Sequence, residues 1–196
     1  MNVAIIKYNA GNIRSVLYAL ERIRHTAIVT DNVAEIINAD KVIFPGVGEA
    51  STAMNYLKER NLDKLICSLT QPVLGICLGM QLMCKYSEEN DTECLGIFDE
   101  DVKKFKVKGE KLKIPQVGWN SIYELKTDLF KNVNENSYCY FVHGYYASSG
   151  EHTIATTNYV QPYSSGLHKD NFYGVQFHPE KSAATGEIIL KNFLEL

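Results

Sequence analysis

Short apolar runs alternate with helical patterns over the first 84 residues. The runs at 3–6, 27–29, 42–44 and 73–76 are rich in Val and Ile and lack polar alternation, as strands buried on both faces do. Between them, apolar residues recur at helical spacing, which predicts helices at 13–23, 33–37, 53–57, 62–69 and from 78 onward. Such strands, separated by helices, predict a parallel sheet covered on both faces.

The pattern changes after residue 85. Residues 88–91 form a polar stretch that predicts a loop, and 96–123 indicate short strands and turns. Residues 138–142 predict a strong strand, and 172–177 are expected to form a hairpin with 166–168 across 169–171. A last helix with apolar residues at 188, 189, 193 and 194 ends the chain. The sequence therefore predicts an α/β fold with a mixed, mostly parallel central sheet, helices on both faces, and one domain spanning 1–196.

Composition and charge exclude several classes of binding partner. The chain has 196 residues, 45% of them hydrophobic, with 20 Lys and Arg against 23 Asp and Glu, and no basic run marks a nucleic-acid or membrane surface. The apolar run at 3–6 is too short for a signal-peptide core or a membrane span. We therefore expect a cytoplasmic protein that binds neither nucleic acid nor membrane.

Five cysteines are present, at 67, 77, 84, 94 and 139. The odd count and the lack of a C-x-x-C pair argue against a disulfide framework and a thiolate zinc site. No metal and no cofactor is expected. Most of these cysteines are expected to be small buried residues, so a reactive one must be identified by its context.

Cys77 has that context, because it lies between Gly75 and Gly79 where a predicted strand meets a helix. This G-x-Cys-x-G spacing is typical of a nucleophile elbow, whose tight turn lifts the sulfur to the helix N-terminus. There the helix dipole favours thiolate, and the N–H of Leu78 can face a developing oxyanion. The same spacing also fits a buried cysteine in a glycine-rich crossover.

A general base is expected at His178, at the end of a strong predicted strand, with Glu180 two residues later. Residues i and i+2 of an extended segment share a face, and Pro179 is expected to keep this segment extended. Glu180 can then accept from one ring nitrogen while the other faces Cys77. A lone His-x-Glu is also typical of a solvated strand end, so the argument depends on its joint occurrence with the elbow.

A third feature is Pro45-Gly46-Val47-Gly48, which follows another strand of the predicted parallel sheet. The carboxyl ends of such strands share one edge, where ligands bind, so N–H groups of Val47 and Gly48 could supply further oxyanion donors. A simple structural turn is the alternative.

These residues resemble the triad-type class I glutamine amidotransferase family, whose fold is flavodoxin-like. The strings carrying the resemblance are 75–81 (GICLGMQ), 178–180 (HPE) and the PGVG loop. More specific strings resemble the glutaminase subunits of imidazole glycerol phosphate synthases, and the match runs from residue 2 to the end; they are 8–16 (YNAGNIRSV), 115–120 (PQVGWN), 141–146 (FVHGYY) and 177–182 (FHPEKS).

The resemblance implies an enzyme that hydrolyses glutamine to glutamate and ammonia with Cys77, His178 and Glu180. It implies that ammonia passes to a (β/α)8-barrel cyclase subunit, in a heterodimer that makes imidazole glycerol phosphate and AICAR during histidine biosynthesis. By the same resemblance, glutamine is held by Gly46, Gln81, His143, Gly144 and Tyr145, and the partner contacts Asn12, Trp119 and Lys181. From its strand alone, His143 also fits a satisfied core histidine.

Two positions depart from the resembled pattern. An acidic residue usually stands at the position of Lys7, before Tyr8-Asn9, and Ser or Thr often stands at Gly144. Two other functions remain open at this point. One is a glutaminase of another branch, such as pyridoxal phosphate synthesis or a paralogous cyclase, although the former is expected to lack 118–120 (GWN). The other is a non-catalytic α/β scaffold with a redox-sensing Cys77, although a sensor needs no oriented base.

Overall fold

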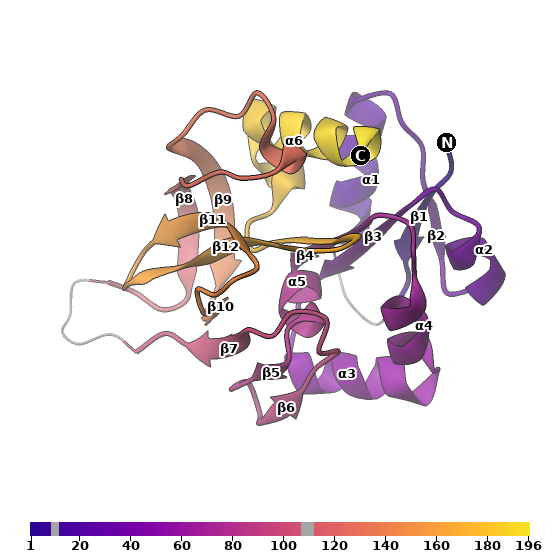
Figure 1. The fold of residues 1–196 in the computed structure, drawn as a ribbon, viewed down its shortest axis with the longest axis horizontal. Helices are drawn as coiled ribbons and strands as arrows, with labels where there is room; N and C mark the ends of the chain where they lie inside the picture. The colour runs from indigo at the N-terminus through magenta and orange to yellow at the C-terminus, as the bar shows by residue number, and fades with distance from the viewer. Residues whose placement is uncertain (9–11, 107–111) are drawn as a thin grey trace.

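A computed structural model describes residues 1–8, 12–106 and 112–196 of the chain. Of the string 8–16 that carries part of the resemblance, residues 9–11 lie outside the described residues. Figure 1 shows the arrangement of the elements along the chain. None of the helices within the described ranges has the length and apolar character needed to cross a membrane.

The first half of the chain folds as its pattern predicts. The elements are β1 (Val3–Ile6), α1 (Ile13–Arg22), β2 (Ile28–Thr30), α2 (Val33–Ile37), β3 (Lys41–Gly46), α3 (Ala50–Glu59), α4 (Leu62–Ser68), β4 (Val73–Cys77) and α5 (Leu78–Met83). β3 is longer than predicted and runs through Pro45. A proline is tolerated there because β1 pairs with β3 only as far as Ile43.

The second half supplies the antiparallel strands. The elements are β5 (Tyr86–Ser87), β6 (Thr92–Glu93), β7 (Asp101–Lys104), β8 (Gln116–Ile122), η1 (Asp128–Phe130), β9 (Ser137–His143), β10 (Tyr145–Ala147), β11 (Thr153–Asn158), β12 (Pro162–Lys169), β13 (Phe172–Val175), η2 (Pro179–Lys181) and α6 (Ala183–Glu195). The predicted hairpin is confirmed, with Gly166 opposite Val175 and Lys169 opposite Phe172.

One large mixed sheet runs through the molecule in the order β2-β1-β3-β4-β13-β12-β10-β7-β5-β6, with β11 paired to β12. The first five strands in this order are parallel, as buried strands joined by helices should be. β8 and β9 form a separate two-stranded antiparallel ribbon. The mixed α/β class predicted from the sequence is therefore confirmed.

Helices cover both faces of the parallel strands: α1 and α6 lie on one face, and α3, α4 and α5 on the other (Figure 1). Neighbouring residues of β3 divide between the two cores. Ile43 packs in the cluster that includes Leu20 of α1 and Phe193 of α6, and Phe44 packs with Leu57 of α3. Alternation along a strand sends successive side chains to opposite faces, so both layers depend on these central strands.

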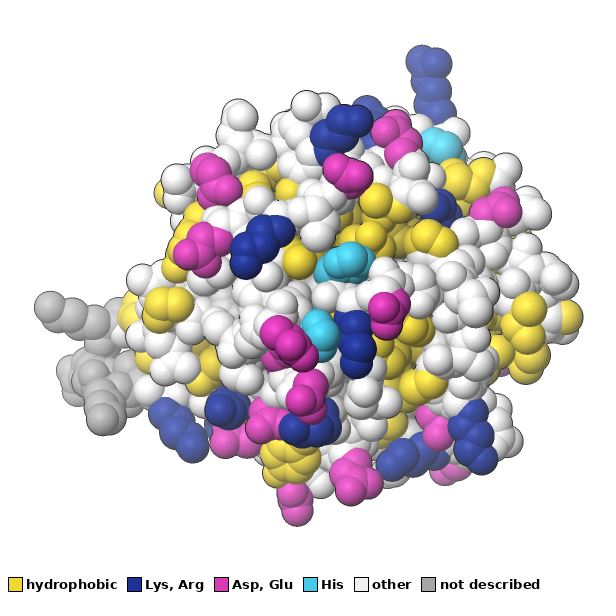
Figure 2. All heavy atoms as spheres, viewed as in Figure 1, with side chains coloured by type: hydrophobic (Ala, Val, Ile, Leu, Met, Phe, Trp, Pro, Cys, Tyr) yellow, Lys and Arg dark blue, Asp and Glu magenta, His cyan; other side chains and the backbone are white. Residues whose placement is uncertain are grey.

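Acidic and basic side chains are interspersed on the face shown in Figure 2, and no basic patch gathers there. That distribution agrees with the near-balanced charge of the sequence.

Gly79 lets α5 pack closely against the backbone of β3. A Cβ at this position would lie 1.9 Å from the Phe44 carbonyl oxygen of β3. Because the neighbouring atom belongs to the β3 backbone, a side chain at this position could be accommodated only if α5 or β3 moved, which is costly in a close-packed core.

We expect Gly79→Ala to lower the free energy of unfolding by more than about 3 kcal/mol, because overpacking here must separate α5 from β3. Gly144→Ala is the matched control: the nearest atom to its added Cβ is 3.8 Å away, and its backbone is not left-handed. That variant should stay within about 1 kcal/mol of the wild type. Urea unfolding of both measures the difference, and equal stabilities would refute the steric argument.

Candidate active site

Cys77 is the last residue of β4 and directly precedes α5. Its backbone has φ 52° and ψ −110°, an unusual conformation for a residue with a side chain. The flanking glycines make the turn possible, since a Cβ at Gly75 would lie 2.8 Å from the Met80 nitrogen and one at Gly79 would strike β3. The nucleophile-elbow geometry predicted from the spacing is therefore present.

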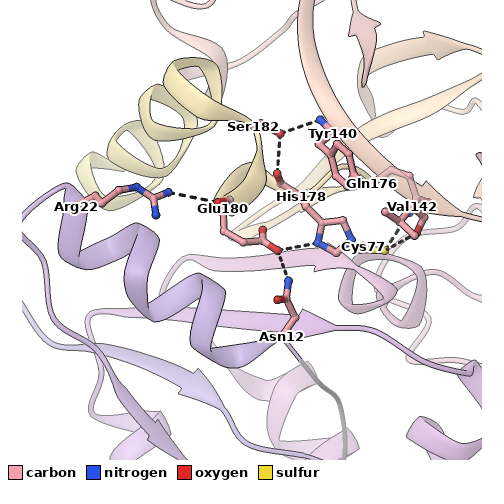
Figure 3. Close-up of polar contacts among 9 residues, drawn as sticks. All are labelled: Asn12, Arg22, Cys77, Tyr140, Val142, Gln176, His178, Glu180 and Ser182. Carbon is pink, nitrogen blue, oxygen red and sulfur yellow. Dashed lines mark hydrogen bonds and ion pairs between the residues drawn. The ribbon is translucent and has the colours of Figure 1, made fainter. Parts of the chain in front are cut away.

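Cys77 is only 6% exposed, but polar groups of the protein contact its sulfur. Its Sγ is 3.8 Å from the Val142 carbonyl oxygen of β9, and the Gln176 side-chain amide donates to it at 3.7 Å. Figure 3 shows these contacts together with His178 and Glu180. Segments from residues 77, 142 and 176–180 thus meet at one point, although they lie far apart in the sequence.

His178 and Glu180 form the predicted pair, with Nδ1 of the ring 2.8 Å from Glu180 Oε1. The backbone prediction for this segment is wrong: Pro179–Lys181 is a turn of 3₁₀ helix, η2, and only His178 is extended. The fixed φ of Pro179 suits the first position of a helical turn, which bends the chain so that Glu180 curls back beneath the ring. The expected contact forms by a different local geometry.

Glu180 is held by more than His178. Its Oε1 also accepts a hydrogen bond from the Asn12 side-chain amide at 2.5 Å, and Arg22 donates to its backbone oxygen at 3.3 Å (Figure 3). Its Oε2 is buried and has no partner among the described residues. Asn12, which the resemblance places at a partner interface, contacts the Glu180 carboxylate and orients it.

The ring of His178 is stabilised in its protonated form. Burial alone would lower its pKa, but hydrogen bonds and negative charge from Cys77 and Glu180 outweigh burial and raise the pKa to about 10. A protonated ring at this position can give its proton to a leaving group. The arrangement can therefore supply a sulfur nucleophile together with an acid that protonates a leaving group.

A cavity of about 220 Å³ opens beside the sulfur. A larger groove of about 410 Å³, between β2 and α2, contains neither cysteine nor histidine and carries none of this chemistry. Most of the residues predicted from the sequence line the smaller cavity: Val47, Gly48, Cys77, Leu78, Gln81, His143, Gly144, Tyr145, His178 and Lys181.

Gly46 does not line this cavity. It pairs with Cys77 across β3 and β4, and a Cβ there would lie 2.4 Å from the Tyr8 hydroxyl and 2.8 Å from the Gly79 nitrogen. Gly46 therefore allows close packing behind the cavity, and its expected contact with substrate is not supported by its position. Tyr8 holds the same segment, donating from its hydroxyl to the Pro45 carbonyl at 2.6 Å.

Gly48 lies at the cavity edge with φ 120°, a conformation that favours glycine, and the space around it is open. Gly144 also has room for a side chain, so the Ser or Thr of the resembled pattern would fit there.

His143 has the surroundings of a core histidine and also lines the cavity. Its ring packs against Phe105 and Tyr163, as a core histidine would. Its Nδ1 is 2.6 Å from the Tyr145 carbonyl oxygen, and its Nε2 is 3.2 Å from the Tyr163 hydroxyl. Because a carbonyl can only accept, Nδ1 carries the proton. Burial lowers the pKa of His143 to about 4, so the ring is neutral and supports the Tyr145 backbone of the cavity wall.

Two further residues at the site were missed by sequence reasoning, one lining the cavity and one behind the Cys77 sulfur. Glu89, in the predicted loop at 88–91, lines the cavity, and its Oε2 accepts from the Ala50 backbone N–H at 2.8 Å. Burial raises the pKa of Glu89. Gln176 is fully buried against Cys77. Only its place two residues before His178 could have marked it, and nothing in a local pattern could have brought Glu89 to the site.

The other four cysteines lack these surroundings. Burial raises the pKa of Cys94 and of Cys139 to about 12, and it raises the pKa of Cys67 and Cys84 as well. All five cysteines are free thiols. Within the described ranges, no group of three or more His, Cys, Asp or Glu residues could hold a metal ion.

The expected interface residues lie beside the site. Trp119 of β8 is 52% exposed and packs edge-on against Tyr140 of β9. Lys181 of η2 lies over the Tyr140 ring, with its Nζ 5.9 Å from the ring centroid. Val117, Tyr138 and Val142 are also exposed on this ribbon. An apolar face of this kind next to a reactive centre is typical of a docking surface.

Comparison with known proteins agrees with this geometry. Residues 4–196 match the family Glutamine amidotransferase class-I. An Imidazole glycerol phosphate synthase subunit HisH from Bacteroides fragilis (strain YCH46) is 59% identical over 196 residues, 100% of both chains. The protein of that name from Yersinia pseudotuberculosis is 46% identical over 198 residues, again 100% of both.

Solved structures share the fold at lower identity. A structure described as a glutamine amidotransferase has a TM-score of 0.74 at 17% identity, covering 98% of this chain and 97% of its own. The structure of PurLQS from Thermotoga maritima has a TM-score of 0.69 at 15% identity, covering 99% of this chain and 97% of its own.

The lowered pKa of His143 predicts a pH dependence of stability. An unfolded histidine titrates near 6.5, so the contribution of His143 is fully present above pH 6.5 and is lost as pH falls toward 4. Between pH 7 and 4, the free energy of unfolding should fall about 2–3 kcal/mol more in the wild type than in His143→Gln. His25→Gln, outside the cavity, serves as the control and should follow the wild type. If the free energy of unfolding fell equally with pH in the wild type and in His143→Gln, a buried neutral ring at His143 would be contradicted.

Proposed function

The chain belongs to the class I glutamine amidotransferase family, and from that membership we propose that it hydrolyses glutamine through a Cys77–His178–Glu180 triad and delivers the ammonia to a cyclase subunit. The observation that carries the proposal is the joint geometry at one cavity: an elbow cysteine, a histidine with a raised pKa, and a carboxylate 2.8 Å from its far nitrogen. A cavity of about 220 Å³ is of the size a small amino acid needs.

In the proposed reaction, the Cys77 sulfur attacks the side-chain amide carbon of glutamine and forms the S–C bond. Negative charge develops on the amide oxygen, where the N–H of Leu78 at the start of α5 and N–H groups of Val47 or Gly48 can donate. The C–N bond then breaks as His178 gives its proton to the departing ammonia. Water attacks the thioester, His178 takes the proton of that water, and glutamate and the free cysteine are released.

The amino-acid end of glutamine is proposed to lie toward Gln81, Glu89 and the backbone of 143–145, which also line the cavity. The Glu89 carboxylate offers a negative charge to an α-ammonium group. Gln81 is fixed for this role, because its Nε2 donates to the Tyr145 carbonyl at 3.0 Å. His143 supports the same carbonyl from the other side.

The proposed partner is a (β/α)8-barrel cyclase of imidazole glycerol phosphate synthase, as the names of the full-length relatives suggest. The exposed ribbon face of Val117, Trp119, Tyr138 and Val142, with Lys181 beside it, supports docking next to the cavity, where ammonia would leave. Five free thiols are compatible with the reducing cytoplasm in which such an enzyme would act.

The triad variants test this function. Cys77→Ala and His178→Ala should lose ammonia release to a similar extent, because the two residues act in one step. Glu180→Gln should retain about ten- to a hundredfold more activity than His178→Ala, because the carboxylate only orients and stabilises the ring. The measurement is kcat for ammonia release with partner saturating, and Cys67→Ala, a change of an exposed cysteine, should behave as the wild type. Ammonia release that survives Cys77→Ala would remove the proposed nucleophile.

Partner dependence tests the coupling. The isolated chain should hydrolyse glutamine slowly and accelerate about a hundredfold or more when the cyclase and its ligand are present, if binding completes the oxyanion donors at Val47 and Gly48. Trp119→Ala should raise the partner concentration needed for half activation by about tenfold or more, as loss of an exposed aromatic anchor does. Ile28→Ala changes an exposed apolar residue at the opposite sheet edge and should have no effect. Full activity without partner would contradict the coupling.

A further inference from the structure

Gln176 lies behind the proposed nucleophile and outside the triad. Its side chain is fully buried and links two residues of the site: its Nε2 is 3.7 Å from Cys77 Sγ, and its Oε1 is 2.8 Å from Gln81 Nε2. Its backbone N–H donates to the Ser165 carbonyl at 3.0 Å, which ties it to β12. Every polar group of its side chain therefore has a specific neighbour, although Gln176 does not line the cavity.

The orientation of this amide follows from its neighbours. Gln81 Nε2 contacts both the Tyr145 carbonyl and Gln176. A backbone carbonyl can only accept, so the Gln81 atom facing it must be its NH₂ group. That group donates its second proton to Gln176, whose oxygen must then face Gln81. The NH₂ group of Gln176 is left facing the Cys77 sulfur (Figure 3).

A donor in this position acts differently on the two forms of the sulfur. The Val142 carbonyl, 3.8 Å from Sγ, can only accept, so it favours the protonated thiol. The Gln176 amide donates, and hydrogen bonds to an ionised acceptor are roughly twice as strong as those between neutral groups. In a buried site the difference is larger than in water, so the amide favours thiolate.

We propose that Gln176 is a positioning residue that stabilises the Cys77 thiolate beside His178, and that Gln81 holds its amide in the orientation this requires. The Gln81–Gln176–Cys77 chain connects the cavity wall to the sulfur. This inference rests on the proposed function for its effect on turnover, whereas its effect on the reactivity of the thiol stands independently.

The test compares two variants of the full chain. Gln176→Met keeps the length and unbranched shape of the side chain but has no donor. Gln176→Glu keeps an oxygen for Gln81 and places a carboxyl group against the sulfur. Alkylation of each cysteine by iodoacetamide at pH 7 is followed by peptide mass mapping, with exposed Cys67 as the reference in the same tube. Asn192→Leu, which removes a buried amide at a distant site in α6, controls for lost stability.

We expect the Cys77-to-Cys67 alkylation ratio to fall about tenfold in Gln176→Met and further in Gln176→Glu. Asn192→Leu should lower the melting temperature without changing the ratio. With partner saturating, kcat for ammonia release should fall in parallel while KM for glutamine stays within about twofold, because Gln176 is not in the cavity.

Unchanged ratios in a folded Gln176→Met or Gln176→Glu variant would overturn the proposal and leave Gln176 a packing residue. An equal fall in Asn192→Leu would overturn it too, since the effect would then come from general loosening. If the wild type with its partner released no ammonia from glutamine, the proposed function would fail, and the alkylation ratios would still decide the role of Gln176.

Discussion

The contact between the α5 backbone and β3 is the constraint on which the site depends. With Gly79 against the Phe44 carbonyl, α5 must start immediately after β4, so Cys77 takes an unusual backbone conformation at the turn. The same packing fixes the neighbouring strand end, where Gly46 pairs with Cys77. One steric contact therefore places the nucleophile at a helix N-terminus and brings the 45–48 loop to its side. The packing of the hydrophobic cores on both faces of the parallel strands maintains the unusual backbone conformation of Cys77.

Two histidines near the cavity show how surroundings set chemical roles. Both are buried, and burial by itself would lower the pKa of each. His178 faces the Cys77 sulfur and the Glu180 carboxylate, whose hydrogen bonds and charges raise its pKa despite burial. His143 faces only a carbonyl and a phenol, and its pKa stays low. The first is thereby suited to carry a proton and the second to hold a backbone segment in place, and neither role could be assigned from the residue type alone.

The sequence predicted the elements and the reacting residues because those depend on local pattern. Buried strands, helical stripes, the elbow spacing and the 166–177 hairpin each follow from a few neighbouring residues. The prediction for 178–180 reached the right contact from the wrong backbone, since Pro179 fits both an extended segment and the start of a 3₁₀ turn. Glu89 and Gln176 were missed because their roles arise only when distant segments pack. No local pattern marks Glu89, and Gln176 is marked only by its place two residues before His178.

Strand β9 of the exposed ribbon also contacts the triad residues, so the two are mechanically linked. In β9, the Tyr140 backbone accepts from the His178 N–H at 2.9 Å, and the Val142 carbonyl lies 3.8 Å from the Cys77 sulfur. The side chains of the same two residues point to the ribbon's outer face, where Trp119 and Lys181 lie against Tyr140. A protein that docks on this face and shifts β9 would therefore displace an acceptor beside the sulfur and the backbone that holds the base. A partner bound to the ribbon could therefore change the positions of Cys77 and His178 through β9.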